Sequence, residues 1–327
     1  MKKLVVLGGG ESGVGAAILG LKQGYEVLLS DRGEVQQKYR DVLLNNEIEF
    51  EEGKHSEDLI FKANVVVKSP GIPDTVDLIQ RIRKAGISVI SEIEWASKFT
   101  NAKLIAITGS NGKTTTTSMI YHMLKTAGLN VGVAGNIGKS FAWQVAGESF
   151  DTYVLELSSF QLDGIESFKP AIAVLLNITP DHLDRYEYDV SLYAKSKFRI
   201  AENMDANDVF IHSTEDPLLM EYKQGQSIKA IELSFGLNAG NAKMIGDELV
   251  GTKGFTMSIE GLKVKGKHNY SNALATVLVG ETMGLKEGVI LESLQSFAAI
   301  EHRMEKVKEV GGVEYINDSK ATNVDAV

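Results

Sequence analysis

Two glycine-rich turns, each lying between an apolar run and a helical pattern, most constrain the fold of this chain. The first turn, Gly8–Gly13, follows Leu4–Leu7, and the second, Gly109–Gly112, follows Leu104–Ile107. A buried strand that passes through a glycine turn into a helix is typical of parallel α/β units. Because the arrangement occurs twice, about a hundred residues apart, the sequence predicts two α/β domains.

Short runs rich in Val and Ile alternate with helical patterns after each turn. We expect further strands at Glu26–Leu29, Val65–Val67, Val89–Ile90, Val131–Ala134, Tyr153–Leu157, Ala171–Leu176 and Asp208–His212. Helical patterns cover Gly15–Lys22, Val76–Lys84, Tyr193–Ile200, Asn269–Met283 and Glu287–Phe297. Between residues 228 and 266, short strands with glycine turns indicate a hairpin edge. The sequence therefore predicts parallel sheets wrapped by helices.

The composition excludes several classes of protein. With 34 Lys and Arg against 43 Asp and Glu, the net charge is −9, which disfavours nucleic-acid binding. The chain has 0 cysteines, so disulfides, iron–sulfur clusters and cysteine nucleophiles are excluded. The first apolar run is too short for a signal peptide, and no run is long enough to span a membrane. We expect a cytoplasmic protein that binds neither nucleic acid nor membranes.

The second glycine turn carries the strongest motif. It comprises Gly109, Ser110, Asn111, Gly112, Lys113, Thr114 and Thr115. Backbone N–H groups of such a loop bind phosphate oxygens, while the lysine reaches the outer phosphates and the first threonine ligates Mg²⁺. Two residues separate the glycines, where the common P-loop has four, so this is a shortened form. The alternative is a tight glycine turn with a capping threonine; the strand, loop and helix together favour phosphate binding.

The first glycine turn fits the pattern G-x-G-x-x-G. Asp31 ends the next predicted strand, where an acid that binds a ribose is expected in dinucleotide-binding proteins. Taken alone this pattern predicts NAD. The same turn equally accommodates another diphosphate-containing nucleotide, or serves only to pack a helix on a strand.

Polar residues at other predicted strand ends extend the candidate site. Glu156 closes one strand and His182 follows the next, and in parallel sheets the carboxyl ends of strands face the ligand crevice. Both side chains could therefore approach a metal near Thr114. Lys195 and Lys197 lie in a predicted basic helix, and nothing physical makes either catalytic. Asn269 opens another helix and is either a cap or a reader of adenine.

The final segment predicts a hairpin. Strands at Arg303–Val310 and Val313–Ile316 flank the turn Gly311-Gly312, and a polar run follows. We interpret it as the start of a third domain.

These motifs in this order resemble the Mur ligase family. The resemblance rests on Gly8–Gly13, Ser69–Ile72, Thr108–Thr115, Gly135–Gly138, Glu156–Gln161, Asn177–Arg185, Lys197, His268–Ala273, Glu301–Arg303 and Asn317–Asn323. It implies an α/β fold with three domains: a Rossmann-like UDP-substrate-binding domain (1–93), a central P-loop ATPase domain with a parallel sheet core (94–299), and the start of a truncated amino-acid-binding domain (300–327).

The resemblance also implies an activity. It is closest to the member that joins D-glutamate to UDP-N-acetylmuramoyl-L-alanine in peptidoglycan precursor synthesis. ATP phosphorylates the substrate carboxylate, the amine attacks the acyl phosphate, and ADP and phosphate are released. We expect a monomer that contributes to cell-wall biogenesis, cell shape and division, and we expect the truncated chain not to ligate.

The family pattern assigns the following roles. ATP binds at Gly109, Ser110, Asn111, Gly112, Lys113, Thr114, Thr115, Asn269, Asn272, Arg303 and Asp318. The UDP-substrate binds at Gly10, Glu11, Ser12, Gly13, Asp31, Ser69, Pro70, Gly71, Asn136, Ser158 and His182. Catalysis depends on Lys113, Lys197, His182 and Glu156. One Mg²⁺ is held by Thr114 and Glu156, and a second by His182 and a CO₂-derived carbamate on Lys197.

Other functions remain open at this point. A non-catalytic nucleotide-binding fragment fits the same motifs, and an NAD-dependent oxidoreductase fits the first turn but has no use for the second. Folylpolyglutamate synthetase shares the ATPase core but lacks the Rossmann-like first domain.

Overall fold

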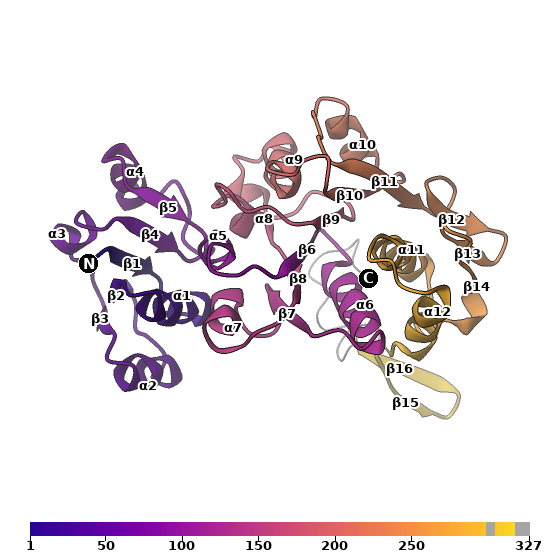
Figure 1. Ribbon diagram of the computed structural model, residues 1–327, viewed down its shortest axis with the longest axis horizontal. Coiled ribbons are helices and arrows are strands. Elements are labelled where there is room, and N and C mark those ends of the chain that lie inside the picture. Colours follow the sequence, from indigo (N-terminus) through magenta and orange to yellow (C-terminus); the bar gives the residue numbers. More distant parts are fainter. Residues whose placement is uncertain (299–304, 318–327) are drawn as a thin grey trace. The chain divides into compact units, whose positions relative to one another are not determined.

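The structure, a computed structural model, describes residues 1–298 and 305–317, which form alternating strands and helices (Figure 1). By its internal contacts the chain divides into two compact units. The first comprises Met1–Lys103 and Gly132–Lys169, and the second Leu104–Val131 and Pro170–Val327. This division places residues 132–169 with the N-terminal part, whereas the sequence assigned them to the central domain. The domain limits at residues 93 and 299 stay a prediction.

A parallel five-stranded sheet forms the centre of the first unit. Its order is β3-β2-β1-β4-β5, with β1 at Lys3–Leu7, β2 at Glu26–Ser30, β3 at Glu49–Glu51, β4 at Val65–Lys68 and β5 at Ser88–Ile90. In register, Lys3 pairs with Glu26 and Leu7 with Ser30. The carboxyl ends of these strands therefore meet at one edge, where Gly8, Asp31 and Ser69 follow.

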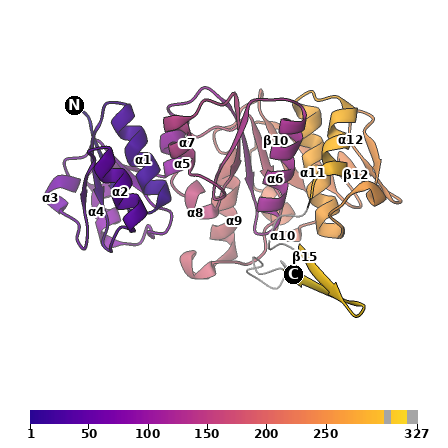
Figure 2. The ribbon, with the colours of Figure 1, turned by 90° about the horizontal axis from the view of Figure 1, so that it is seen from below.

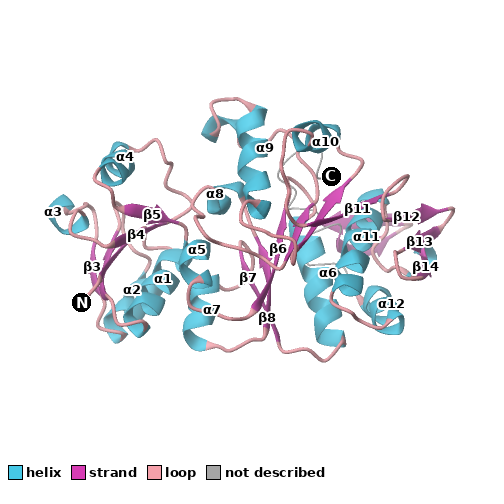
Figure 3. Cartoon of the chain, turned by 45° about the horizontal axis from the view of Figure 1, so that its top comes forward, coloured by secondary structure: helices cyan, strands magenta, loops and turns pink. Residues whose placement is uncertain are grey.

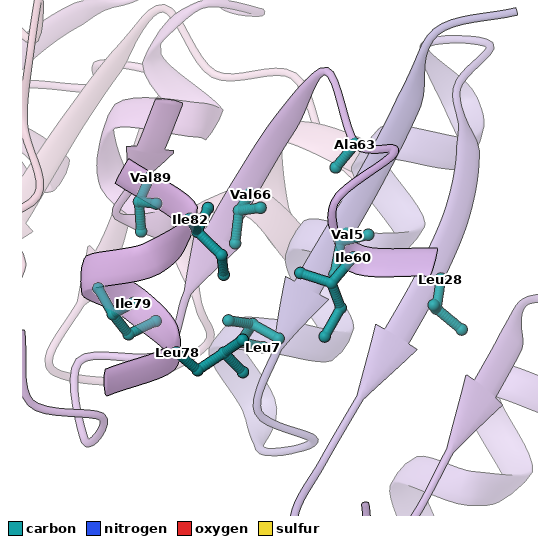
Figure 4. Close-up of a cluster of buried hydrophobic side chains, with 10 residues drawn as sticks. All are labelled: Val5, Leu7, Leu28, Ile60, Ala63, Val66, Leu78, Ile79, Ile82 and Val89. Atoms are coloured by element: carbon teal, nitrogen blue, oxygen red, sulfur yellow. The ribbon is translucent and has the colours of Figure 1, made fainter. Parts of the chain in front are cut away.

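Helices cover both faces of this sheet (Figure 1). They are α1 (Glu11–Lys22), α2 (Gln37–Asn45), α3 (Glu57–Ile60) and α4 (Asp77–Lys84). The cluster under α3 and α4 contains the alternate residues Val5 and Leu7 of β1, because successive strand side chains point to opposite faces (Figure 4). Ile60, Ile79 and Ile82 complete it with 1% or less of their surface exposed. Each such side chain contributes about 2 kcal/mol of burial free energy.

The first unit also contains α5 (Glu92–Ser97) and the segment 132–169. Along this segment lie β7 (Val131–Gly135), α7 (Phe141–Gly147), β8 (Thr152–Glu156) and α8 (Ser159–Leu162). Helix α7 packs against α1 and α5. The buried Glu94 carboxylate accepts backbone N–H groups of Glu166, Ser167 and Phe168, which fixes α5 to that turn.

The second unit is built on strands that run in the order β14-β13-β12-β11-β10-β9-β6. They are β6 (Lys103–Thr108), β9 (Ile172–Leu175), β10 (Val209–Ser213), β11 (Ile231–Gly236), β12 (Ala242–Ile245), β13 (Glu248–Val250) and β14 (Thr256–Ser258). From β6 to β12 the neighbours are parallel, and β12 to β14 form antiparallel hairpins. The predicted hairpin edge is confirmed.

Helices lie on both faces of these strands. On one side are α6 (Lys113–Thr126), α11 (Lys267–Thr282) and α12 (Glu287–Ser296), which pack together; on the other are α9 (Val190–Phe198) and α10 (Pro217–Lys223) (Figures 2 and 3). Short 3₁₀ turns occupy Leu183–Arg185, Arg199–Ala201 and Ile259–Gly261. Helix α6 therefore begins at the carboxyl end of β6, as a nucleotide loop requires.

The predicted C-terminal hairpin is confirmed over its described part. Strands β15 (Glu305–Val310) and β16 (Val313–Asn317) are antiparallel. Gly311 and Gly312 form the turn with φ of 59° and 78°. Two consecutive positive φ angles suit glycine and a twisted hairpin.

Most predicted strands match the structure within one or two residues at each end. Helix α1 begins at Glu11 instead of Gly15, because the last residues of the glycine turn already form its first turn. No range was predicted from the sequence for β3 or for the helices α2, α3, α5, α7, α8 and α10. Among these, β3 and α3 have 3 and 4 residues and too few side chains to show a period. Among the helices that the structure describes, none is long and apolar enough to cross a membrane.

Candidate nucleotide-binding site

The second glycine turn forms a tight loop between β6 and α6. Gly112 precedes the helix with φ of 81°, a conformation that favours glycine. A Cβ atom there would also lie 2.7 Å from the Asn272 side-chain oxygen of α11. Glycine is therefore favoured at position 112 for two reasons: the positive φ angle and the close approach of α11.

Two lysine side chains converge on this loop. Lys113 Nζ donates to the carbonyls of Gly109 at 2.8 Å and Ser110 at 2.7 Å. Lys197 Nζ, from α9, donates to the same Gly109 carbonyl at 2.8 Å. Lys197 is only 1% exposed, whereas Lys195 on the same helix is exposed. The loop is therefore a cationic site, as phosphate binding requires.

Tyr193 joins Lys197 to the loop from the same helix. Its ring centroid lies 4.5 Å from Lys197 Nζ, and its hydroxyl lies 3.1 Å from the Ser110 hydroxyl. Burial raises the pKa of Tyr193 to about 12, so the phenol stays neutral near pH 7. No role for Tyr193 followed from the sequence motifs. Its signal was its spacing of four residues from Lys197, which places both on one helix face.

The loop after β9 forms several hydrogen bonds with the glycine loop. Asn111 N–H donates to the Asn177 side-chain oxygen at 2.8 Å, and the Asn177 amide donates back to the Asn111 carbonyl at 3.0 Å. The Ser110 hydroxyl donates to the Thr179 carbonyl and accepts its N–H, both at 2.9 Å. We call residues 177–179 the strap, because they hold both central residues of the glycine loop.

His182 follows the strap in an exposed position. Its φ is 51° and its side chain is 54% exposed. The Nε2 atom lies 3.7 Å from the Asp181 carboxylate. Thr114, in the first turn of α6, is half-buried. Thr114 and His182 thus each follow a strand of the same sheet, whereas Lys197, the third predicted metal ligand of this unit, lies on α9.

The two predicted adenine-binding residues of α11 are both buried. The Asn269 amide donates to the Lys265 carbonyl at 2.9 Å, and Asn272 contacts the glycine loop through Gly112. The N-cap of α11 is Gly266, so Asn269 is not the cap. Arg303 and Asp318, the other predicted adenosine contacts, lie outside the described residues.

The first glycine turn forms a second candidate site, at the strand edge of the first unit. One Asp31 oxygen accepts Gly9 N–H and the other accepts Gly33 N–H, at 2.7 Å. Ser69 N–H donates to the Leu7 carbonyl, which brings the Ser69–Gly71 loop beside the turn. Lys68, only 5% exposed, supports that loop by donating to the Ile72 carbonyl at 2.6 Å. The predicted UDP-substrate residues Gly10, Glu11, Ser12, Gly13, Asp31, Ser69, Pro70 and Gly71 thus gather at this edge.

The remaining predicted residues of the first unit have their own partners. Glu11 accepts Ser140 N–H at 2.9 Å. Ser158 caps α8 in a capping box with Gln161, which already occupies its hydroxyl. Asn136 donates through its amide to Glu156 Oε1 at 2.9 Å.

The Glu156 carboxylate is suited to bind a cation. It is 2% exposed, and its Oε2 atom is buried without a hydrogen-bond partner. A buried carboxylate oxygen without a donor is costly unless a cation compensates it. Within the described ranges, no three His, Asp or Glu side chains gather as a ready metal cluster.

The fold and the cationic loop define an α/β nucleotide-binding protein. Family models match as the Mur ligase middle domain over residues 107–280 and the Mur ligase MurD-like N-terminal domain over residues 2–91. The chain belongs to the Mur ligase family.

Curated relatives agree with these matches. The chain is 50% identical to the UDP-N-acetylmuramoylalanine–D-glutamate ligase of Christiangramia forsetii, over 99% of this chain and 74% of the relative. It is 49% identical to the enzyme of that name from Bacteroides fragilis, over 100% of this chain and 74% of the relative.

Solved structures share the fold. The UDP-N-acetylmuramate:L-alanyl-γ-D-glutamyl-meso-diaminopimelate ligase of Neisseria meningitides aligns with a TM-score of 0.66 and 22% identity, over 92% of this chain and 99% of that one. The UDP-N-acetylmuramate–alanine ligase of Thermotoga maritima aligns with a TM-score of 0.61 and 22% identity, over 97% and 74%.

Proposed function

We propose that this chain is the UDP-substrate- and ATP-binding part of a ligase that joins D-glutamate to UDP-N-acetylmuramoyl-L-alanine and converts ATP to ADP and phosphate. The observation that carries the proposal is the convergence of Lys113 and Lys197 on the Gly109 carbonyl at the start of α6. The identity of the substrate is inferred from the names of relatives that are about 50% identical to this chain.

In this proposal the second unit transfers the phosphoryl group. Backbone N–H groups of the glycine loop bind the phosphates of ATP. In this structure Lys113 donates to loop carbonyls. With ATP bound, its ammonium group would turn to the transferred phosphoryl group and neutralise its charge. The substrate carboxylate attacks the γ-phosphorus and the bond to ADP breaks. The D-glutamate amine then displaces phosphate from the acyl phosphate, so no protein nucleophile is needed.

In the first unit, the Asp31 carboxylate would accept a hydroxyl or N–H donor of the UDP part of the substrate. A carboxylate has about four acceptor positions. Asp31 uses two of them on Gly9 and Gly33 N–H groups, which leaves others for donors of the nucleotide. Gly10–Gly13 and Ser69–Gly71 lie beside it.

Magnesium has suitable ligands in this chain. In the second unit, Thr114 would ligate one ion, and His182 with a carbamate on Lys197 a second; in the first unit, the buried Glu156 oxygen without a donor is suited to a cation. When bound, Mg²⁺ offsets phosphate charge in the transfer. The carbamate forms when neutral Nζ adds to CO₂, making an N–C bond and releasing a proton; it converts a cation into the oxygen ligand that Mg²⁺ prefers.

The carbamate has its own test. ¹³C-bicarbonate NMR of the chain with Mg²⁺ should give a carbamate resonance that disappears in Lys197→Ala and persists in Lys195→Ala. A spectrum without that resonance in the Mg²⁺-loaded protein would remove the carbamate and leave Lys197 as a phosphate contact.

The function as a whole is tested by calorimetry with separate ligands. We expect the chain to bind UDP-N-acetylmuramoyl-L-alanine and MgADP, and not NAD. Binding of NAD in the micromolar range without UDP-substrate binding would instead identify an oxidoreductase. Monomeric state, location in the cytoplasm and roles in cell shape and division stay predictions.

A further inference from the structure

Asp216 connects two elements that the proposed mechanism does not use. It precedes α10 as its N-cap, and its Oδ1 atom accepts Leu219 N–H at 2.7 Å. Its Oδ2 atom accepts Ile178 N–H at 2.8 Å, from the middle of the strap. A capping residue needs only one acceptor, so the second bond requires another explanation.

The strap is held from both sides. On one side, Asn177 and Thr179 bond to Asn111 and Ser110 of the glycine loop. On the other side, the N–H of the residue between them, Ile178, donates to Asp216. Ile178 as a whole residue is 1% exposed, so its backbone N–H cannot donate to bulk solvent instead. Loss of the carboxylate would leave this donor unsatisfied and release the centre of the strap.

We propose that Asp216 is a positioning residue of the nucleotide site: by bonding Ile178 it holds the strap, and through the strap it keeps Ser110 and Asn111 in the phosphate-binding conformation. This inference rests on the proposed function, because it requires that the glycine loop bind nucleotide phosphates. The Asp216 carboxylate bonds to Ile178 and Leu219, and it acts on the glycine loop through residues 177–179.

Serine separates the two bonds of Asp216. Serine is as good an N-cap as aspartate, so Asp216→Ser keeps the cap on Leu219. It has no second oxygen for Ile178. Asp216→Ala removes both bonds. The neighbouring Glu215 is a matched control, since its carboxylate points instead to Asn238, whose N–H and side-chain amide it accepts at 3.1 and 2.9 Å.

The experiment measures MgADP affinity by calorimetry on the whole chain, with UDP-N-acetylmuramoyl-L-alanine as the internal reference. Asp216→Ser should weaken MgADP binding about tenfold, the effect of one hydrogen bond to a charged group. Its affinity for the UDP-substrate should stay unchanged, and so should both affinities in Glu215→Ala. Hydrogen exchange should speed up at Ile178 and Asn111 but not at Leu219.

The outcomes are distinguishable. If the wild-type chain binds MgADP and Asp216→Ser binds it equally well, the positioning role is wrong and the proposed function stands. If Asp216→Ser weakens both ligands and lowers the melting temperature as much as Asp216→Ala, Asp216 is only structural. If the wild-type chain binds no MgADP, the proposed function and this inference fail together.

Discussion

The two glycine-rich turns share a backbone plan, yet they are held by side chains of opposite charge. In the first, the Asp31 carboxylate binds Gly9 N–H, and Glu11 reaches Ser140. In the second, the ammonium groups of Lys113 and Lys197 bind loop carbonyls. A loop lined by cations suits the charged end of a triphosphate, whereas a turn lined by carboxylates suits hydroxyl and N–H donors. The comparison shows that a glycine pattern places a ligand while distant side chains decide its chemistry.

A substitution at the cationic turn should have the greatest effect on activity. Lys113→Ala removes the charge that faces the transferred phosphoryl group. In a ligase that contains this chain we expect turnover to fall at least ~100-fold, measured as phosphate release. Lys125→Ala, in the exposed last turn of the same helix, is the control and should keep turnover. Near-normal turnover of Lys113→Ala would remove the P-loop assignment.

A glycine substitution tests the geometry of each turn in the same way. Gly112→Ala forces a Cβ into the left-handed region and toward Asn272, so unfolding free energy should fall by about 1–3 kcal/mol. Gly10→Ala in the first turn is the matched case, with φ of −80° and no atom within 4 Å of the added Cβ. Because Gly10 is the N-cap of α1 and alanine caps less well, its loss should cost a smaller amount, about 0.5–1 kcal/mol. Equal losses in denaturant melts would contradict this difference between the turns.

The acidic turn is tested at Asp31. Asp31→Ala frees the N–H groups of Gly9 and Gly33, and should weaken binding of UDP-N-acetylmuramoyl-L-alanine about tenfold by calorimetry. MgADP affinity should not change. Asp41→Ala, on the exposed face of α2, is the control and should leave both unchanged. A parallel loss of MgADP binding would mean that the turns do not serve separate ligands.

The last prediction concerns the pH dependence of stability in the first unit. Burial raises the pKa of Glu92 to about 7, with the nearby Glu11 carboxylate adding to the shift, and Glu92 accepts Ala142 N–H. The folded state therefore keeps a proton that the unfolded state releases near pH 4.5. This group's contribution to stability is present below pH 4.5 and is lost as pH rises toward 7, by at most ~1.4 kcal/mol per pH unit.

Glu92→Gln should remove that dependence. The difference in melting temperature between variant and wild type should grow in favour of the variant from pH 5 to pH 8. A difference that stays constant with pH would contradict the raised pKa.

Much of the fold was predictable because it depends on local patterns. Apolar runs between glycine turns located β1, β6 and the helices that follow them, and Gly311-Gly312 located the last hairpin. Short elements such as β3 escaped because 3 residues cannot show a period. In the candidate site, the glycine loop and Lys113 were found from one contiguous motif. Asp216 had a visible signal as a cap before Pro217, but its second bond to Ile178 had none.

Residue spacing along a helix was enough to predict which side chains share a face. Lys195 and Lys197 point in different directions because positions two apart lie about 200° around a helix, and the structure has one exposed and the other buried. Which charged side chains reach each glycine turn depends on the tertiary structure. Lys197 meets Gly109 across 88 residues and Asp31 meets Gly9 across 22. Such contacts follow from strand order and helix packing, which bring together residues that no local pattern links.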